Sequence, residues 1–584
     1  MGRCGLYAVA HMKLAMVLKD TGYDFGGDHR LNVFLTNSLE EAGKTDLQLS
    51  FFDSDPLACE SIEANKAKKN NGINVIIGNP PYSGESANKG KWIMDLMEDY
   101  KKEPGGIIKL QERNPKWLND DYVKFIRYAQ TYIERAGSGI LAYICPHGFL
   151  DNPTFRGMRW NLLQTYDKIY VLDLHGNAKK KEVCPDGSKD ENVFDIQQGV
   201  CIIISVKNIT KKNDAQVFHA DLFGLRTYKY NYLNKVNFEN VSYKGIKPSE
   251  PHFFIVPKDF TSQNEYNSSI MITDLFIANS VGVVSAKDKV LTSQSIKKLL
   301  TQVSEYYNIK AENTLCKHIY YRPFEKRYIY YDVDLLERSR DKITGNFFGR
   351  NNLGICLNKV VKTGDTYQHI FISDTMIDSC YVSNRTSEIT YIIPLYLYNA
   401  DYGTKSVNIR TNIATKLLLP IGIKYTDDMA LHIFDYIYAV LHSPQYREKY
   451  KEFLKIDFPR VPYPTDQETF WKLVKIGSKL RECHLMQTEF NTEPYRFIGD
   501  GTNEVVKPEF KNGRVYISKT QYFDNVPQAQ WEQYIGGYQP LQKWLKDRKK
   551  TMLSDEDIEH YKKIIAALKL TEELMAEIDQ VVEF

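Results

Sequence analysis

The stretch INVIIGNPPYSG, residues 73–84, decides how the N-terminal part of the chain folds. Its first half is an apolar run of strand character that ends at a glycine, and Asn79, Pro80, Pro81 and Tyr82 follow at once. In α/β sheets, ligands bind outside the carboxyl ends of the strands, so this turn lies where chemistry is expected. The alternative is a rigid surface turn, because Pro-Pro commonly marks loops.

The segments around this stretch alternate between helix and strand patterns. Apolar residues at helical spacing indicate helices, whereas near-continuous apolar runs are typical of buried strands. The helical segments are residues 8–18, 57–69 and 120–135, the last behind an Asn119/Asp120 cap, and the strand-like segments are 31–39, 74–78, 139–145, 168–174 and 200–206. This order predicts an α/β fold with a doubly wound, Rossmann-like sheet over residues 1–211.

Residues 212–584 differ in composition and pattern: they are rich in Tyr, Lys and Asn, and short strand-like segments are mixed with helical ones. A chain of 584 residues is too long for one core. We therefore expect a second domain, mixed α+β, with a helical C-terminal part in which residues 553–579 form a capped, charged helix pair.

Charge and cysteine content exclude several classes. The net charge of +3 provides no global basic field, so nucleic-acid affinity must come from local patches. The nine cysteines are scattered without a CxxC pair or a Cys/His cluster at ligand spacing, so we expect reduced thiols in a cytoplasmic protein and no metal site. No run approaches the roughly 18–20 apolar residues of a membrane span, so no membrane partner is expected.

The Asn-Pro-Pro-Tyr turn suits one reaction. The lone pair of an exocyclic amine on a purine ring is delocalised, which makes the nitrogen a poor nucleophile. If the Asn79 side chain and the Pro80 carbonyl each accept an N–H of that amine, the nitrogen is drawn towards a tetrahedral form that attacks a methyl group. Pro80 and Pro81 fix the backbone of the second acceptor, and Tyr82 offers a flat face for a base taken out of the duplex.

The sequence also resembles a known family. GNPPYS is similar to the catalytic motif of DNA adenine-N6 methyltransferases, and the closest resemblance is to the fused restriction–modification enzymes called Type ISP. Further similar segments follow in the expected order over nearly the whole chain: YAVAHMKL, RLNVFLTNSLEE, LNDDYVKFIRYAQ, FRGMRWNLL, LDLHGN, ENVFDIQQGVCIII, YYRPFEKRYIYYD, HSPQYREKYKEFLKIDFPRVPYP and GGYQPLQKWLKDRK. The resemblance implies a site-specific adenine-N6 methyltransferase acting on double-stranded DNA, with S-adenosylmethionine as methyl donor.

The resemblance also implies roles for single residues. It makes the Asn-Pro-Pro-Tyr turn the amine-activating element and gives Tyr82 and Phe194 the two faces of the flipped adenine. Asn37 and Phe125 would contact the adenine of the cofactor. For Phe194 and Phe125, an ordinary position in the apolar core is an equally good explanation.

The second domain resembles a target-recognition domain. Its candidate DNA contacts are basic residues interleaved with aromatic ones, namely Lys287, Arg322, Lys326, Arg327, Arg338 and Arg340. Arginine can read guanine edges or hold phosphates. For Arg322, a structural Arg-Pro-Phe corner is an equal alternative.

One departure from the family is large. Its members carry a glycine-rich loop of the DPAxGTG type before the YAVAHMKL segment, and this sequence contains none. We therefore expect the first strands of the sheet to be missing, because the chain is a C-terminal portion of a longer enzyme with a fused nuclease or motor region, or a truncated reading frame, or because a partner supplies the rest. We expect this chain alone to bind cofactor poorly. Two alternatives stay open: a DNA-recognition module or inactive remnant without cofactor, and a methyltransferase of RNA bases or protein glutamine.

Overall fold

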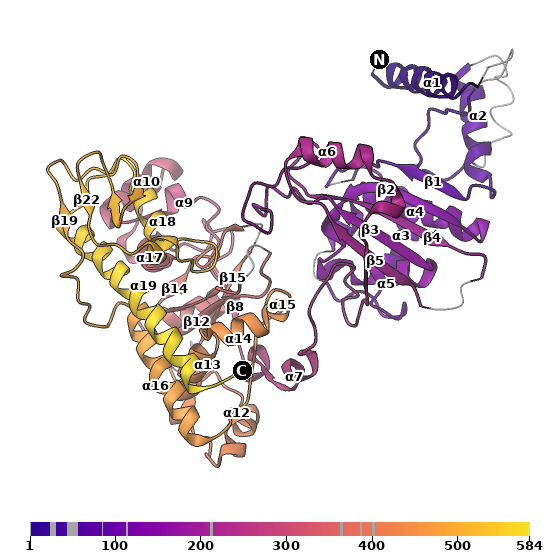
Figure 1. The fold of residues 1–584 in the computed structure, drawn as a ribbon. Helices are drawn as coiled ribbons and strands as arrows, with labels where there is room; N and C mark the ends of the chain where they lie inside the picture. The colour runs from indigo at the N-terminus through magenta and orange to yellow at the C-terminus, as the bar shows by residue number, and fades with distance from the viewer. Residues whose placement is uncertain are drawn as a thin grey trace. The chain divides into compact units, whose positions relative to one another are not determined.

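The computed structural model describes residues 2–23, 31–43, 56–84, 86–112, 115–210, 214–362, 366–385, 388–399 and 403–584. They form two compact units, Met1–Lys258 and Asp259–Phe584, coloured indigo to magenta and magenta to yellow in Figure 1. The predicted boundary at residues 211–212 lies outside the described residues. Helix α6 (Arg226–Lys235), which the sequence placed in the second domain, belongs to unit 1.

Unit 1 is built on a six-stranded mixed sheet of order β1-β2-β4-β3-β5-β6. The strands are β1 (Val75–Gly78), β2 (Gly139–Pro146), β3 (Lys168–Asp173), β4 (Val200–Lys207), β5 (Gln216–Asp221) and β6 (Lys244–Ile246). β1 pairs with β2 and β3 with β5 in parallel, whereas β4 runs antiparallel to both β2 and β3. Residues 174–199 between β3 and β4 contain no helix, so the chain turns back without the crossover that a parallel strand requires.

Side chains of the sheet alternate between two packed faces. Leu141, Tyr143 and Cys145 of β2 join a core with helices α3 (Lys91–Met97), α4 (Asp121–Ala136) and α5 (Arg156–Thr165). Ile144, between them, packs on the other face in a cluster that includes Tyr232 and Leu233 of α6. This alternation with period two is what places successive strand residues on opposite faces.

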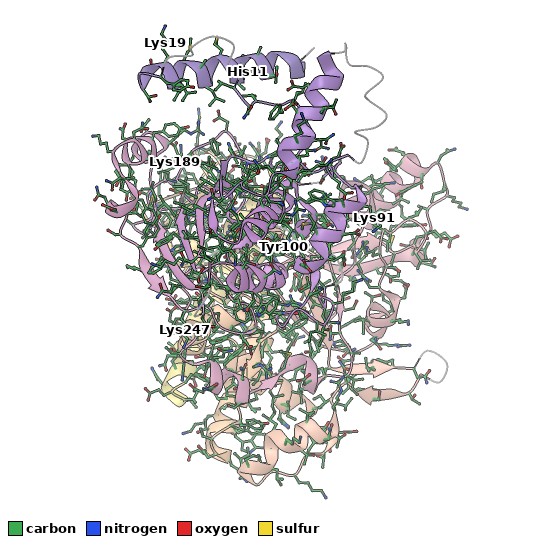
Figure 2. The ribbon with its side chains drawn as sticks, turned by 90° about the vertical axis from the view of Figure 1, so that its right-hand side faces the viewer. His11, Lys19, Lys91, Tyr100, Lys189 and Lys247 are labelled. Carbon is green, nitrogen blue, oxygen red and sulfur yellow. The ribbon has the colours of Figure 1, made fainter. Side chains whose placement is uncertain are left out.

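The side chains labelled in Figure 2 illustrate this division between core and surface. Tyr100 is fully buried, whereas the side chains of Lys91 and Lys189 are 88% and 74% exposed. Helices α1 (Gly2–Asp20) and α2 (Pro56–Lys69) precede the sheet in the chain.

The strand predicted within residues 31–39 is wrong. Residues 31–37 form no regular element, and none of the described strands pairs with them. The segment is instead held by side chains: Asn37 Oδ1 accepts the Leu39 N–H at 3.1 Å, and Lys68 Nζ donates to the Asn37 carbonyl at 2.7 Å. An apolar run forms a β-strand only where a neighbouring strand pairs with it through backbone hydrogen bonds.

Unit 2 combines several small sheets with long helices, as expected for a mixed α+β domain. One four-stranded sheet contains β9 (Thr292–Ser293), β10 (Cys316–Arg322), β11 (Glu325–Tyr330) and β14 (Met376–Ile377), and another contains β8 (Ser280–Val281), β12 (Gly354–Asn358), β13 (Ile370–Ser373) and β15 (Thr390–Pro394). A third contains β19 (Phe497–Ile498), β20 (Glu509–Lys511), β21 (Arg514–Tyr516) and β22 (Tyr522–Phe523), and two-stranded pairs join β7 (Ile270–Met271) to β18 (Arg460–Val461) and β16 (Tyr396–Tyr398) to β17 (Lys405–Val407).

Helices α13 (Ala430–Val440), α16 (Gln467–His484) and α19 (Asp555–Val581) supply much of the core of this unit. The shorter helices are α7 (Gln263–Ser268), α8 (Ile272–Leu275), α9 (Asp288–Leu291), α10 (Ile296–Tyr307), α11 (Asp341–Thr344), α12 (Thr411–Leu418), α14 (Pro444–Lys449), α15 (Lys451–Leu454), α17 (Gln528–Glu532) and α18 (Pro540–Lys546).

The C-terminal segment is one helix and not the predicted pair. α19 runs for 27 residues from a capping box at Ser554, where the Ser554 side chain and Asp557 satisfy each other's backbone N–H groups. No glycine or proline interrupts residues 555–581, so nothing in the sequence ends the helix midway. Among the described residues, no helix is both long and apolar enough to cross a membrane.

Candidate functional site

The predicted site lies at one edge of the unit 1 sheet. Because β1, β2, β3 and β5 run in the same direction, their carboxyl ends meet there. Asn79 follows β1, His147 follows β2, and His175 follows β3 by two residues. The edge therefore gathers polar residues from three strand ends, as open α/β sheets do where they bind ligands.

The turn after β1 is held by the side chain of Tyr82. Tyr82 Oη lies 2.6 Å from Asn79 Oδ1 and 3.1 Å from the carbonyl oxygen of Ile144 on β2, so its one proton can serve either acceptor. Burial raises the pKa of Tyr82, which keeps the phenol protonated. Asn79 is exposed and Pro80 is buried. The amide oxygen that would accept an incoming N–H thus already accepts a bond from Tyr82.

Asp120 fixes the other end of this turn, a role that the sequence did not predict. Its carboxylate accepts the backbone N–H groups of Ser83 at 3.2 Å and Gly84 at 3.1 Å, and the residue is only 3% exposed. Asp120 does stand at the N-cap of α4, as expected, but its side chain makes no capping bond. The carboxylate therefore ties the end of the Asn79–Tyr82 turn to the start of a core helix.

Phe194 is half-buried on the connection between β3 and β4. Its N–H donates to Asn192 Oδ1 at 2.8 Å, and its carbonyl accepts from Arg226 Nη2 at 3.0 Å. The buried Asn192 also donates to the carbonyls of Gly176 and Gln198. The connection is thus rigidly supported at Phe194, and Phe194 and Tyr82 both pack against the same apolar cluster.

The predicted cofactor contacts are engaged within the protein. Asn37 Nδ2 donates to Glu40 Oε1 and to Asn88 Oδ1, both at 3.0 Å, while its oxygen accepts from Leu39. Phe125 is half-buried on α4 and packs against the core of unit 1. Phe125 keeps its alternative as an ordinary core residue, and Asn37 would have to exchange partners to bind an adenine.

Three of the predicted DNA contacts make ion pairs of 3.1 Å or less within the protein. Arg322 is 6% exposed, pairs with Asp378 at 2.8 Å and lies 3.8 Å from the Tyr321 ring centroid. Arg327 pairs with Glu325 at 3.1 Å, and Lys326 pairs with Asp374 at 3.0 Å. The arrangement of Arg322 is that of a structural corner, and a side chain so buried cannot reach DNA without rearrangement.

The other three lie on two neighbouring segments of the chain, and Arg338 Nε is 4.0 Å from Glu337 Oε1. An antiparallel bridge joins Val284 to Arg338, which brings the segment of Lys287 beside that of Arg338 and Arg340. Lys287 is exposed and lies 4.9 Å from the Tyr307 ring centroid, and the Arg338 side chain is 60% exposed. Arg340 Nε is buried and makes no hydrogen bond among the described residues. We call these three residues the basic ridge.

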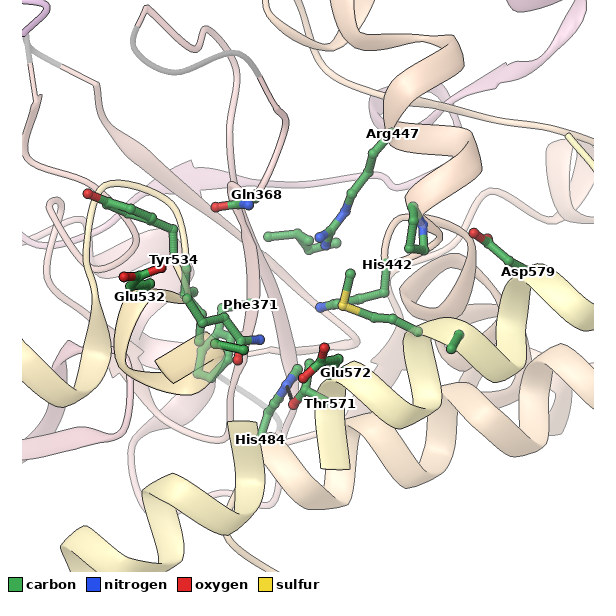
Figure 3. Close-up of a pocket in the computed structure, with 17 residues that line it drawn as sticks. Gln368, Phe371, His442, Arg447, His484, Glu532, Tyr534, Thr571, Glu572 and Asp579 are labelled. Carbon is green, nitrogen blue, oxygen red and sulfur yellow. Dashed lines mark hydrogen bonds between the residues drawn. The ribbon is translucent and has the colours of Figure 1, made fainter. Parts of the chain in front are cut away.

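A cavity of about 640 Å³ opens elsewhere in unit 2 (Figure 3). Its lining includes Gln368, His442, Arg447, His484 and Glu572. No predicted DNA contact lines it. Among the lining residues, His484 Nε2 and Thr571 Oγ1 lie 2.9 Å apart.

The structure also brings together residues that the sequence did not connect. His147, His175 and Glu182 each offer one potential ligand atom, and these atoms lie within 4.8 Å of one another. Short-range spacing of cysteine and histidine does not reveal this cluster, because His147 and His175 follow different strands. The signal that could have found them is their position directly after two strands of the same sheet.

Comparisons with known proteins cover both units. Residues 7–179 match the Eco57I restriction-modification methylase family, and residues 293–577 match the Type ISP C-terminal specificity domain. A search of curated proteins gave no match.

Three solved structures share the fold. The DrdV–DNA complex matches with a TM-score of 0.75 at 21% identity, covering 98% of this chain and 62% of that one. The ATP-dependent Type ISP enzyme LlaBIII bound to DNA matches with a TM-score of 0.77 at 22% identity, covering 99% and 41%. A nuclease-deletion mutant of the Type ISP enzyme LlaGI with a DNA substrate mimic matches with a TM-score of 0.76 at 19% identity, covering 99% and 50%.

The chain thus spans between 41% and 62% of the length of these three proteins. The resemblance inferred from the sequence is confirmed by the two family matches. The chain pairs a region of restriction–modification methylase type with a specificity domain of Type ISP type.

Proposed function

We propose that the chain is the methyltransferase and target-recognition part of a restriction–modification system, and that it methylates adenine N6 in a specific double-stranded DNA site. The observation that carries this proposal is the turn Asn79–Tyr82 at the carboxyl edge of the sheet, anchored by Asp120 and Ile144. That turn lies within the region that matches the methylase family.

Some of these residues would activate the adenine amine, and others would bind the flipped base. Asn79 Oδ1 and the Pro80 carbonyl accept the two N–H groups of the adenine amine, and Tyr82 keeps its proton for the Ile144 carbonyl when Asn79 changes partner. Phe194 provides the second aromatic surface for the extrahelical base. S-adenosylmethionine, when bound, supplies the methyl group. Asn37 and Phe125 are the residues that we propose to contact it, and the glycine-rich loop that would hold its methionine part is not in the sequence.

The experiment compares methyl transfer with DNA binding. The chain, joined to the glycine-rich loop and first strands of a related methylase, is incubated with labelled S-adenosylmethionine and a pool of duplexes, and Asn79→Ala is compared with Asn74→Ala at the opposite end of β1. Asn79→Ala should abolish transfer and leave DNA binding intact, while Asn74→Ala should change neither. Transfer retained in Asn79→Ala would contradict the role of the turn.

A calorimetric titration with S-adenosylmethionine tests the alternative function, a DNA-recognition module without cofactor. The three engaged contacts of Asn37 favour that alternative for this chain alone. DNA binding without cofactor binding would support it. Clear binding at micromolar concentration would exclude it.

We further propose that the basic ridge contacts DNA in unit 2. Arg338→Ala should weaken DNA binding and reduce the salt dependence by about one phosphate contact. Arg496, an exposed arginine elsewhere in unit 2, gives the matched control Arg496→Ala. Equal effects of the two substitutions would show that the ridge has no special role.

A further inference from the structure

The cluster of His147, His175 and Glu182 connects two parts of the sheet edge. His147 begins directly after β2, while His175 and Glu182 lie on the connection that leads from β3 to Phe194. His147 and His175 are buried and Glu182 is partly buried. An ion or a hydrogen-bond network that joins these three side chains would therefore also hold the connection between β3 and β4 in place.

One ring nitrogen of each histidine lies within hydrogen-bond distance of a carboxylate. His147 Nδ1 lies 3.0 Å from Asp173 Oδ1, and His175 Nε2 lies 2.9 Å from Asp221 Oδ1. The nitrogens that remain for coordination are Nε2 of His147 and Nδ1 of His175, and the latter lies 3.0 Å from Glu182 Oε1. Histidine ligands of metals almost always carry such a carboxylate on the second nitrogen, because it fixes the tautomer and the ring orientation.

The backbone is shaped to place both rings. His175 has a φ of 51°, a left-handed conformation that residues other than glycine rarely adopt. Gly199 leaves room for the other ring, because a Cβ at that position would lie 2.4 Å from His147 Nε2. The His175 ring also stacks on Phe223 with centroids 3.8 Å apart. These constraints fix the directions of the two free nitrogens.

The cluster can also be explained without a metal. Burial lowers the pKa of His175, but its bonds to Asp221 and Glu182 outweigh burial and raise the pKa to about 10. Two imidazolium rings among the carboxylates of Asp173, Glu182 and Asp221 would then form an ion-pair network. A divalent cation would replace the two protons and leave the same total charge, so the two states compete for one set of side chains.

We propose that His147, His175 and Glu182 bind one divalent cation of the zinc class. Two imidazole nitrogens and one carboxylate oxygen suit Zn²⁺, whereas Mg²⁺ and Ca²⁺ prefer all-oxygen sites. The fourth position is open to water, and the cation would displace the 3.2 Å contact between Asn177 Nδ2 and His147 Nε2. The cation cross-links the end of β2 to the connection that carries Phe194, so its role is structural and does not depend on the methyltransferase proposal.

The test measures binding of the metal alone. Tag-free full chain is treated with a chelator, and Zn²⁺ or Mg²⁺ is titrated by calorimetry. We expect one equivalent of Zn²⁺ to bind and Mg²⁺ to bind far more weakly. Glu182→Gln and His175→Gln should each lower the Zn²⁺ affinity at least tenfold, whereas Asp186→Asn, an exposed carboxylate on the same connection, should not.

Two further measurements keep the result decisive if a ligand variant unfolds. Asp221→Asn removes only the partner of His175 Nε2 and should weaken binding about 10- to 100-fold. X-ray absorption at the zinc edge should give two nitrogen ligands at about 2.0–2.1 Å. Absence of stoichiometric binding, or affinity that Glu182→Gln and Asp221→Asn leave unchanged, would overturn the proposal and identify the cluster as an ion-pair network.

Discussion

One carboxylate, that of Asp120, determines whether the turn after β1 keeps its shape. The substitution Asp120→Asn keeps the size of the side chain but retains only one acceptor oxygen for the N–H groups of Ser83 and Gly84. The other N–H then faces an amide NH₂ group. Since a hydrogen bond to a charged group contributes about 1.5–3 kcal/mol, local opening of the turn becomes easier by that amount.

The global effect should differ from the local one. Burial raises the pKa of Asp120 more than the backbone N–H groups lower it, which means that ionisation of this carboxyl is disfavoured in the folded protein. A neutral asparagine therefore removes a desolvation cost, and the free energy of unfolding of unit 1 should change little. Loosening of the turn without loss of the fold is the specific expectation.

Hydrogen exchange followed by mass spectrometry measures both effects at once. At about 1.4 kcal/mol per factor of ten, exchange at Ser83 and Gly84 should become about 10- to 150-fold faster in Asp120→Asn. Exchange in the α4 core should stay unchanged. Asp95→Asn, which alters an exposed carboxylate paired with Lys91, is the matched control. Unchanged exchange at Ser83 and Gly84 would refute the anchoring role of Asp120.

Three further predictions concern stability and base binding. Arg548→Met leaves the buried Glu325 with Arg327 as its remaining cationic partner and should cost about 3 kcal/mol in urea unfolding, and a loss below about 1 kcal/mol would contradict this. Burial and Arg447 lower the pKa of His484 to about 3 in the folded protein. Below pH 6.5, the ordinary pKa of histidine, the unfolded state therefore binds one proton more at His484 than the folded state does. His484 alone should therefore lower the free energy of unfolding by about 1.4 kcal/mol per pH unit between pH 6.5 and about 3, and His484→Gln should flatten the total slope by one proton. Tyr82→Ala should weaken binding of a fluorescent extrahelical purine by about 1–3 kcal/mol through lost stacking, while Tyr82→Phe should have a much smaller effect.

Local features of the structure follow from the sequence. The apolar run before Asn79 and the cap before α4 are short-range signals, and both elements form where the pattern predicts them. The direction of β4 does not follow from such signals, because an apolar run carries no information on whether its neighbours are parallel. It depends on the connection 174–199, which contains no helix.

Long-range partners decide what the predicted site residues do. The role of Asp120 depends on backbone groups 36 and 37 residues away, and the burial of Arg322 depends on Asp378, 56 residues away. A sequence segment that interleaves basic and aromatic residues has the same pattern whether its arginines contact DNA or an acidic residue in the core. The cluster of His147 and His175 cannot be predicted from local sequence for the same reason, because it forms only where the ends of β2 and β3 meet at the same edge of the sheet.

The hydrogen bonds around Asn79 have a consequence for how the proposed chemistry would begin. In the free protein its amide oxygen is already satisfied by Tyr82, so an incoming amine must displace a good bond. Rotation of the Tyr82 hydroxyl redirects its hydrogen bond to the Ile144 carbonyl at 3.1 Å without moving the ring, which compensates the displaced bond. The bond to Tyr82 also fixes which end of the Asn79 amide points at the ligand, because only the oxygen can accept it. The turn therefore keeps its acceptor oriented before the base arrives and releases it at little cost.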